Sequence, residues 1–250
     1  MPEPYISIRG LTQRFGENEV LRGIDLDIYR GETLVILGSS GGGKSVLLKH
    51  LPGLLRPVSG TITVDGVEIS RLQERELGPV RRQMGVMFQG GALFDSFTVA
   101  ENVAFPLRES GVKKESELKS RVAEALEIVR LPGEEDKLPS DLSGGMRKRV
   151  ALARAVVGKP ACVLYDEPHA GLDPVTADSI DHLIKDLQRT QGMTNIVVTH
   201  EMRSVFRIAD RVIFLEKGKV HWTGTPDELR ETKDPELRAF IDGDSGEPWE

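Results

Sequence analysis

Cysteine and long apolar runs are both scarce in this sequence, and each shortage excludes a structural feature. Cys162 is the single cysteine, so no intrachain disulfide can form, and its apolar neighbours predict a buried, unreactive thiol. No uninterrupted apolar stretch reaches the roughly 18 residues of a membrane-spanning helix. The first residues lack the basic and apolar segments of a signal peptide. If the protein works at a membrane, another chain is therefore expected to hold it there.

An excess of positive charge is also missing. Lys and Arg number 33 against 39 Asp and Glu, which gives a formal net charge of −6. This balance argues against the broad basic face that nucleic-acid binding needs. The short basic runs Lys113-Lys114 and Arg147-Lys148-Arg149 are predicted to be solvated helix faces. A chain of 250 residues, 39% of them hydrophobic, is long enough to bury a sizeable core.

What the sequence does contain is an alternation of strand and helix patterns. Period-two alternation and short apolar runs predict strands at residues 5–11, 24–28, 33–37, 61–64, 67–69, 85–88, 161–165, 195–199, 211–215 and 220–223. The pair Asp65-Gly66 between two of these strands predicts a hairpin. Helical periodicity and start signals predict helices at residues 44–51, 118–129 and 174–189, from Ser143, and near Glu201.

The alternation implies an α/β fold with a largely parallel sheet covered on both faces. We expect one domain over residues 1–240, with a helical insertion at about residues 91–157. Residues 241–250 are acidic and contain glycine, so they are expected to form a loosely held tail.

A glycine-rich loop with a lysine lies between a predicted strand and a predicted helix. It matches G-x-x-x-x-G-K-[ST], a pattern that wraps backbone amides around phosphate oxygens. The residues are Gly38, Ser39, Ser40, Gly41, Gly42, Gly43, Lys44 and Ser45, and Val46 follows them. Lys44 is predicted to reach the β- and γ-phosphates and Ser45 to ligate Mg²⁺. The alternative, a loop that binds nothing, leaves the lysine after three glycines unexplained. The motif alone leaves kinases, GTPases, motors and transporters open.

An apolar strand that ends in two acids is the second candidate element. Asp166 and Glu167 follow the run from Cys162 to Tyr165. Asp166 is predicted to hold Mg²⁺, directly or through water, and Glu167 to polarise the attacking water. A positioned base of this kind contributes about 10²–10⁴-fold in rate. The alternative is an exposed acidic turn after a core strand, which is less consistent with the phosphate loop earlier in the chain.

The segment Leu142-Ser143-Gly144-Gly145-Met146 precedes a predicted helix. Ser143 can cap that helix, and the two glycines leave amides bare at its positive end. Here the sequence resembles the ATP-binding cassette (ABC) family, whose hallmark is an LSGGQ-like signature, and the resemblance covers nearly the whole chain. It implies a P-loop NTPase (RecA-like) core with an antiparallel β subdomain and a helical insertion that carries the signature. It also implies ATP hydrolysis with Mg²⁺ in a head-to-tail dimer, where each ATP lies between the loop of one copy and the signature of the other.

Other residues match elements of that family in order. Phe15 lies where the family places an aromatic that stacks on adenine, and a core phenylalanine is the competing interpretation. Gln89 resembles the glutamine that senses Mg²⁺ and water, and Asp173 resembles the loop that couples the two sites. His200, at the end of an apolar strand, resembles the switch histidine at the γ-phosphate.

Two residues depart from the family pattern. Met146 replaces the usual glutamine of the signature, so one polar contact near the nucleotide is expected to be missing or replaced. His169 stands just after Asp166-Glu167-Pro168, where the family commonly has threonine or serine, and the sequence does not say what it does there.

Local resemblance also bears on cargo and partners. Residues 88–96 and 101–108 resemble the ATPases of Mla-type systems, which work with MCE (mammalian cell entry) proteins in bacterial phospholipid trafficking. The implied partners are a second copy of the chain, membrane permease subunits, an MCE-type protein and a small regulatory subunit, at the cytoplasmic face of the inner membrane. Gly90, Gly91, Phe94 and Phe97 would suit a groove for a permease helix, or would only pack the insertion onto the core. Another cargo, a soluble non-transport ABC protein and a module that no longer hydrolyses ATP remain as alternatives.

Overall fold

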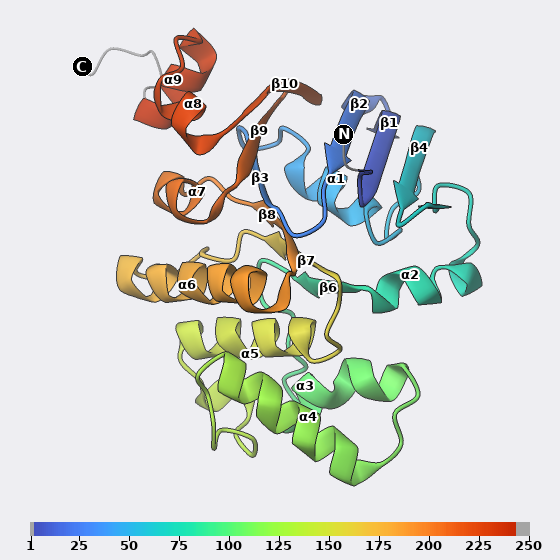
Figure 1. Cartoon of the computed structure of the whole chain (residues 1–250), viewed down its shortest axis with the longest axis vertical. Helices are drawn as coiled ribbons and strands as arrows, with labels where there is room; N and C mark the ends of the chain where they lie inside the picture. The colour runs from blue at the N-terminus through green and yellow to red at the C-terminus, as the bar shows by residue number, and fades with distance from the viewer. Residues whose placement is uncertain (1–2, 244–250) are drawn as a thin grey trace. The chain divides into compact units, whose positions relative to one another are not determined.

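The computed structural model describes residues 3–243 (Figure 1). The chain divides into two compact units. Within the described range, unit 1 comprises residues 3–73 and 197–243, and unit 2 comprises residues 74–196. The predicted single domain with a helical insertion at residues 91–157 stays a prediction. Most of the predicted acidic tail, residues 244–250, lies outside the described residues.

Unit 1 contains a four-stranded antiparallel sheet in the order β2-β1-β4-β5. Its strands are β1 (Ile6–Phe15), β2 (Asn18–Ile28), β4 (Ser59–Val64) and β5 (Val67–Glu68). Ile6 on β1 lies opposite Ile28 on β2 and Val64 on β4. The turn between β4 and β5 has positive φ at both Asp65 and Gly66, which matches the right-handed twist of a hairpin. The predicted hairpin is therefore confirmed.

The other strands of unit 1 lie in the order β10-β9-β3. They are β3 (Thr33–Leu37), β9 (Arg211–Glu216) and β10 (Lys219–Gly224). β3 and β9 are parallel, and Leu37 lies opposite Phe214. Every residue of β3 is buried, as expected for a strand covered on both faces. The helices of unit 1 are α1 (Lys44–His50), α7 (Met202–Ile208), α8 (Pro226–Arg230) and α9 (Pro235–Asp242).

Unit 2 contains the neighbouring strands β6 (Met84–Met87) and β7 (Cys162–Asp166), which are parallel. β8 (Thr194–Val198) lies next to β7, and the boundary between the units falls inside it. Its helices are α2 (Gly78–Arg82), α3 (Val99–Glu109), α4 (Glu115–Ile128), α5 (Gly144–Val156) and α6 (Pro174–Gln191). The predicted parallel pairing of strands separated by helices is thus found in both units.

Three helices of unit 2 pack together as a layer, α3 against α4 and both against α5 (Figure 1). α4 buries Leu118, Val122, Ala125 and Leu126, the apolar face that the sequence predicts. The sequence did not predict α3, although Thr98 and Glu101 form a capping box at its start. That pattern, Thr-x-x-Glu before an apolar run, could have identified the helix.

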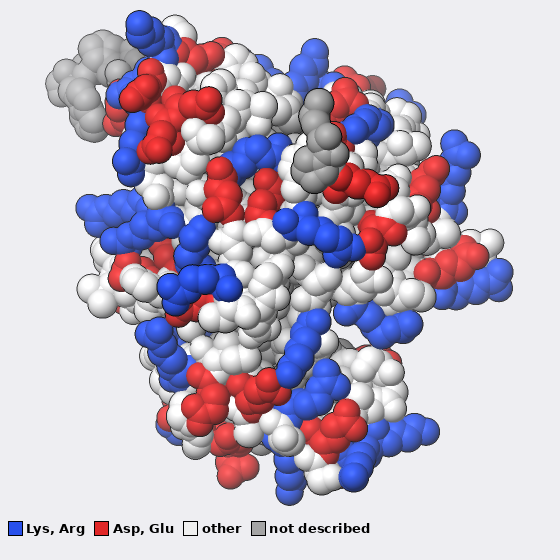
Figure 2. All heavy atoms as spheres, viewed as in Figure 1, with Lys and Arg blue, Asp and Glu red and all other residues white. Residues whose placement is uncertain are grey.

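Charges of both signs are interspersed on the face of the molecule in Figure 2. Exposed ion pairs also form within one unit, such as that of Lys159 with Glu124 at 2.6 Å. Among residues 3–243, no helix is both long and apolar enough to cross a membrane.

Candidate functional site

The glycine-rich loop joins β3 to α1 in unit 1 and is held by close backbone contacts. Gly38 has φ 150°, and a Cβ at this position would lie 2.1 Å from the carbonyl oxygen of Leu215 on β9. Gly43 has φ 98°, and a Cβ there would lie 2.8 Å from Leu21 Cδ2. A residue other than glycine would therefore collide with the main chain of β9 at position 38, and it would have a strained backbone at position 43. Ser39 Oγ donates to Glu216 Oε2 over 3.1 Å, and Gly42 N donates to Ser39 O over 3.1 Å.

The lysine of the loop is directed at the loop itself. Lys44 Nζ donates to the carbonyl oxygens of Gly38 at 2.7 Å and Ser39 at 2.9 Å. Ser45 and Val46 are half-buried in the first turn of α1, and the carbonyl oxygen of Val46 accepts a hydrogen bond from His50 Nδ1 at 2.7 Å. The loop therefore has the wrapped backbone and the positive charge that a phosphate chain requires.

Two further predicted residues lie in unit 1. Phe15 ends β1 with 49% of its surface exposed. The interpretation of Phe15 as a core residue is therefore wrong, and its ring is available for stacking. His200 is exposed and follows Thr199, whose N–H donates to Ile36 O on β3 over 3.4 Å. Because β3 leads into the loop, this bond holds the residue before His200 against the strand from which the loop starts.

The acid pair of unit 2 lies at the carboxyl end of β7. Asp166 is the last residue of the strand and is buried, with 7% of its surface exposed. Glu167 is half-buried and has φ 49°, in the left-handed region that a non-glycine residue rarely adopts. Such strain persists where the surrounding structure holds it, and it is common at active sites. The exposed acidic turn considered as an alternative is therefore not what the structure contains.

The residues of β7 that precede Asp166 form a buried, unreactive part of the core. All residues of the strand are buried, and burial raises the pKa of the Cys162 thiol. The predicted buried, unreactive cysteine is confirmed. Tyr165 donates its hydroxyl to Asn195 Oδ1 on β8 over 3.2 Å, which fixes the end of the strand just before the acids.

Gln89 and Lys148 are joined by a contact that the sequence did not reveal. Gln89 is exposed and follows β6. Lys148, on α5, has only 7% of its surface exposed and donates to the carbonyls of Gln89 and, over 3.5 Å, of Glu167. Burial lowers the pKa of Lys148, while the charges of Glu167 and Asp166 act in the opposite direction. The prediction of a solvated basic face is wrong at Lys148, whereas Arg147 is exposed.

The signature segment starts α5. Ser143 is the N-cap, and its Oγ accepts from Met146 N over 3.2 Å, as predicted. Ser143 and Gly144 are exposed. Gly145 is half-buried, and a Cβ on it would lie 2.5 Å from Thr176 Cγ2 on α6. The two glycines therefore differ: a Cβ on Gly144 would make only ordinary contacts, 3.9 Å from Arg147 Nη2 and Leu172 Cδ2, whereas the missing side chain of Gly145 allows α5 to approach α6.

His169 lies in the turn between β7 and α6, and Asp173 lies at its end, just before α6. Asp173 is exposed and caps α6, accepting from the N–H groups of Val175 and Thr176 at 3.0 Å each. The hydrogen bond from the Thr176 hydroxyl holds the pKa of Asp173 below its usual value. His169 is buried, and its Nε2 lies 2.7 Å from Asp181 Oδ1 on α6. The residue that departs from the family pattern thus ties the turn after Glu167 to α6.

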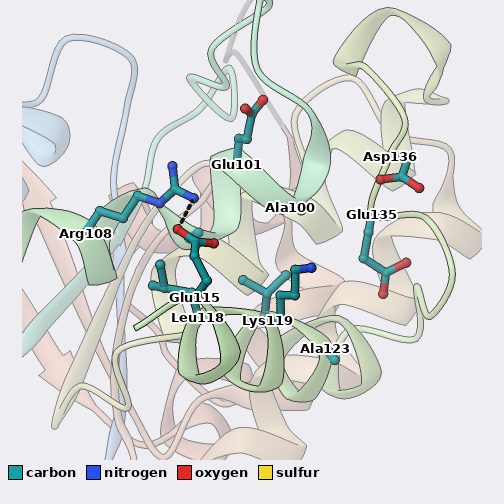
Figure 3. A pocket seen from close by; sticks show the side chains of 11 residues that line it. Ala100, Glu101, Arg108, Glu115, Leu118, Lys119, Ala123, Glu135 and Asp136 are labelled. Atoms are coloured by element: carbon teal, nitrogen blue, oxygen red, sulfur yellow. Dashed lines mark hydrogen bonds and ion pairs between the residues drawn. The ribbon is translucent and has the colours of Figure 1, made fainter. Parts of the chain in front are cut away.

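A separate pocket of about 380 Å³ lies between α3 and α4 (Figure 3). Its floor is apolar and its rim is charged, and the dashed line in Figure 3 marks the Arg108–Glu115 ion pair at 3.3 Å. The pocket is lined by Ala100, Glu101, Ala104, Arg108, Glu115, Leu118, Lys119, Val122, Ala123, Glu135 and Asp136. No residue predicted to bind nucleotide lines it.

The chemistry of these groups fits a nucleotide with a divalent cation. The loop of unit 1 offers backbone amides and an ammonium for phosphate oxygens. The residues predicted to hold Mg²⁺ are Ser45, Gln89 and Asp166, and their hydroxyl, amide and carboxylate oxygens are the ligands that Mg²⁺ prefers. Glu167 adds a carboxylate that can accept a proton from water.

Proteins of a known family are similar in sequence to most of this chain. The family described as "ABC transporter" matches residues 21–170. A probable ribonucleotide transport ATP-binding protein, mkl, of Mycobacterium leprae is 43% identical over 238 residues, which cover 95% of this chain and 69% of that protein. The methionine import ATP-binding protein MetN of Brucella abortus is 43% identical over 217 residues, 87% of this chain and 58% of that protein.

Solved structures agree. A dimeric, post-hydrolysis state of the ATP-binding cassette MJ0796 with ADP and Pi matches with a TM-score of 0.82 and 32% identity, covering 88% of this chain and 98% of that one. The structure of cbiO1 from Clostridium perfringens, part of the ABC transporter complex cbiONQ, matches with a TM-score of 0.84 and 32% identity over 95% of each chain. These matches confirm the predicted α/β P-loop NTPase fold. The chain belongs to the ABC transporter family, as one of its ATP-hydrolysing cassettes.

Proposed function

We propose that two copies of this chain bind ATP with Mg²⁺ and hydrolyse it to drive a membrane permease that transports phospholipid. The observation that supports a dimer concerns the N-terminus of α5. Ser143 and Gly144 are exposed there at a capped helix N-terminus, which is a ready site for an anion. The phosphate loop is in unit 1, so the chain has two different helix starts suited to phosphate. A nucleotide bound by both, from separate copies, would couple its own hydrolysis to opening and closing of the pair.

Each predicted residue has a role in that cycle. Lys44 and the loop amides bind the β- and γ-phosphates, Val46 lies in the first turn beyond the loop, and Phe15 stacks on the adenine. Asp173, at the start of α6, links the two sites of the dimer. When bound, Mg²⁺ would neutralise charge on the phosphates and would be held by Ser45, Gln89 and Asp166.

Hydrolysis itself depends on two side chains. Glu167 orients a water molecule and accepts its proton, and its left-handed backbone fixes where the carboxylate points. His200 donates a hydrogen bond to the γ-phosphate as charge develops on it. Loss of either group would slow turnover while leaving the binding loop of unit 1 unchanged.

The surface after β6 suits a permease helix. Phe94 has 41% of its surface exposed, and its ring centroid lies 5.0 Å from that of Phe97 and 4.9 Å from that of Phe105. Arg154 donates to the carbonyl oxygens of Gly91 at 2.6 Å and Ala92 at 2.7 Å, which fixes the loop before this cluster. An exposed aromatic cluster on a fixed loop supports docking of an apolar helix as well as internal packing.

A groove of about 460 Å³ in the same unit favours acidic groups on the docked segment. Phe105 and Pro106 contribute apolar walls. The charged residues that line it are basic except for Glu109, and the basic ones are Arg81, Arg82, Arg121 and Arg154. A permease segment with apolar residues and one or two carboxylates would complement such a surface.

Phospholipid cargo rests on the resemblance of residues 88–96 and 101–108 to Mla-type ATPases. By that resemblance, the further partners are an MCE-type protein and a small regulatory subunit, with the chain at the cytoplasmic face of the inner membrane. The second candidate is transport of another solute. The names of the relatives above favour it, since they refer to ribonucleotide and methionine.

Two experiments test the proposal. Glu167→Gln should form a stable dimer with ATP in size-exclusion chromatography, because the closed state cannot hydrolyse its nucleotide. A Glu167→Gln variant that stays monomeric with ATP and hydrolyses it at the wild-type rate would refute two assignments. Glu167 would not be the general base, and ATP would not bind between two copies. Gentle purification of the complex in detergent, with identification of the other chains and of bound phospholipid, tests the cargo. A solute-binding protein and no phospholipid would favour the second candidate.

A further inference from the structure

Lys148 is a buried lysine on the helix that begins with the signature segment. It lies on α5 with 7% of its surface exposed, whereas its neighbour Arg147 is exposed. An ammonium group that is removed from water needs hydrogen-bond acceptors around it. The acceptors that the structure provides are main-chain carbonyl oxygens of other segments, not a carboxylate in direct contact.

The two acceptors belong to the residues assigned to hydrolysis. Lys148 Nζ donates to the carbonyl of Gln89, just after β6, and to the carbonyl of Glu167, just after β7, at 3.5 Å. Because β6 and β7 are adjacent parallel strands, their carboxyl ends lie at the same edge of the sheet. One side chain from α5 therefore spans both strand ends.

The contact at Glu167 falls on a strained backbone. Glu167 has φ 49°, and its carbonyl also accepts from Ala170 N over 3.2 Å. A left-handed non-glycine residue keeps that conformation only where its neighbours hold it. The ammonium of Lys148 and the amide of Ala170 together fix the carbonyl, and through it the direction of the Glu167 side chain.

We propose that Lys148 is a positioning residue, which fixes the main chains of Gln89 and Glu167 relative to the signature helix. A shift of α5 is thereby transmitted to both side chains at once, so that water activation depends on the state of the signature segment. This inference rests on the proposed function only in taking Gln89 and Glu167 as residues of hydrolysis. In this role Lys148 acts through the main chains of Gln89 and Glu167, which accept its hydrogen bonds.

The first test uses Lys148→Met in the purified transport complex. Methionine keeps the length and apolar stem but removes the donor. We expect kcat for ATP hydrolysis to fall about 10–100-fold, because small displacements of catalytic groups have effects of this size, while KM for ATP changes less than about threefold. Lys119→Met, an exposed position on α4, is the matched control and should retain the wild-type kcat. A wild-type kcat in Lys148→Met, or an equal loss of ATP binding and turnover, would overturn the proposal.

A second test separates positioning from simple loss of stability. Lys148→Gln retains an N–H donor and should keep a kcat at least about fivefold above that of Lys148→Met. Each Lys148 variant is also combined with Gln89→Ala. Residues that act together give effects that do not add, so the double variant should lose less than the product of the two single losses. Strictly multiplicative losses would mean that Lys148 is only structural.

Both outcomes can be distinguished from failure of the proposed function. Wild-type and Lys119→Met complexes that hydrolyse ATP, together with an inactive Lys44→Ala, establish the hydrolytic site independently of Lys148. If Lys148→Met does not fold, the double-mutant cycle between Lys148→Gln and Gln89→Ala distinguishes positioning from a structural role. Non-additive losses in that cycle support the positioning role, and multiplicative losses overturn it.

Discussion

The two glycine-rich helix starts of this protein are built differently. α1 begins after Gly43, which has φ 98° and provides no side-chain cap. α5 begins after Ser143, which has an extended backbone and caps the helix with its own hydroxyl. The first start follows a strand and is enclosed by Val20 and Leu21, whereas the second is exposed at Ser143 and Gly144.

The difference indicates a division of labour. A helix start without a cap leaves its backbone N–H groups for a ligand, and the nearby Lys44 adds charge. A helix start with a serine cap is already stable and needs no ligand to form. We therefore expect the loop of unit 1 to determine ATP binding and the start of α5 to determine turnover.

The largest effect is expected for Lys44→Ala. This change removes the ammonium that bonds Gly38 and Ser39 and that is predicted to reach the phosphates. ATP turnover of the complex should fall about 10²–10³-fold, the usual effect of removing one stabilising donor. The control is Lys49→Ala, an exposed lysine of the same helix, which should keep its activity. Near-normal hydrolysis by Lys44→Ala would contradict the assignment of this loop as the phosphate-binding loop.

Ser143→Arg tests the opposite side of the comparison. An arginine at the start of α5 would occupy the space proposed for phosphate of the partner copy. Turnover should fall roughly 100-fold, while the separate chain should still bind ATP in an equilibrium titration. Ser116→Arg, at an exposed position on α4, controls for the added charge. Loss of ATP binding together with turnover would argue against two separate roles.

Gly43→Ala should destabilise the protein at the uncapped start. A Cβ at φ 98° would be strained and would lie 2.8 Å from Leu21 Cδ2. We expect a loss of about 1–3 kcal/mol in the free energy of unfolding, measured by urea denaturation. Gly158→Ala is the control, because its φ is not positive and its Cβ would meet no atom within 4 Å. Equal stability of the two variants would mean that the loop relaxes freely.

The smallest effect is expected for Ser143→Ala. Removing the bond from Met146 N to Ser143 Oγ should cost about 1 kcal/mol, and Ser143→Asp should restore it. The loss corresponds to a shift of about 2–4 °C in the melting temperature. An unchanged melting temperature in Ser143→Ala would mean that α5 owes its start to packing rather than to its cap.

Sequence reasoning was most successful for features that depend only on residues close together in the sequence. The hairpin at Asp65-Gly66 and the cap at Ser143 depend on neighbouring residues only, and both were predicted. The phosphate loop was recognised from spacing, and the structure adds that Gly38 is required because β9 approaches it. The predicted roles of the site residues stay predictions until the variants are measured.

Sequence reasoning failed, or left a residue unassigned, where tertiary packing determines whether a side chain is buried. Lys148 is charged and sits between two arginines, so the sequence suggested a solvated face, but α5 packs on β6 and buries it. Phe15 could not be assigned, since an aromatic residue at a strand end can point either way, and it is exposed. His169 had no readable role because its partner Asp181 lies on α6, beyond any local pattern.

The contact between the phosphate loop and β9 has a consequence for the order in which the protein is made. The Leu37–Phe214 register, the approach of Gly38 to Leu215 and the bond from Ser39 to Glu216 all join early residues to late ones. At about 5–20 residues per second, a ribosome adds the intervening chain in roughly 10–35 s. A nascent polypeptide that stops before β9 lacks these contacts. Incomplete translation products should therefore be unable to consume ATP, and only a finished cassette would join the cellular pool of active motors.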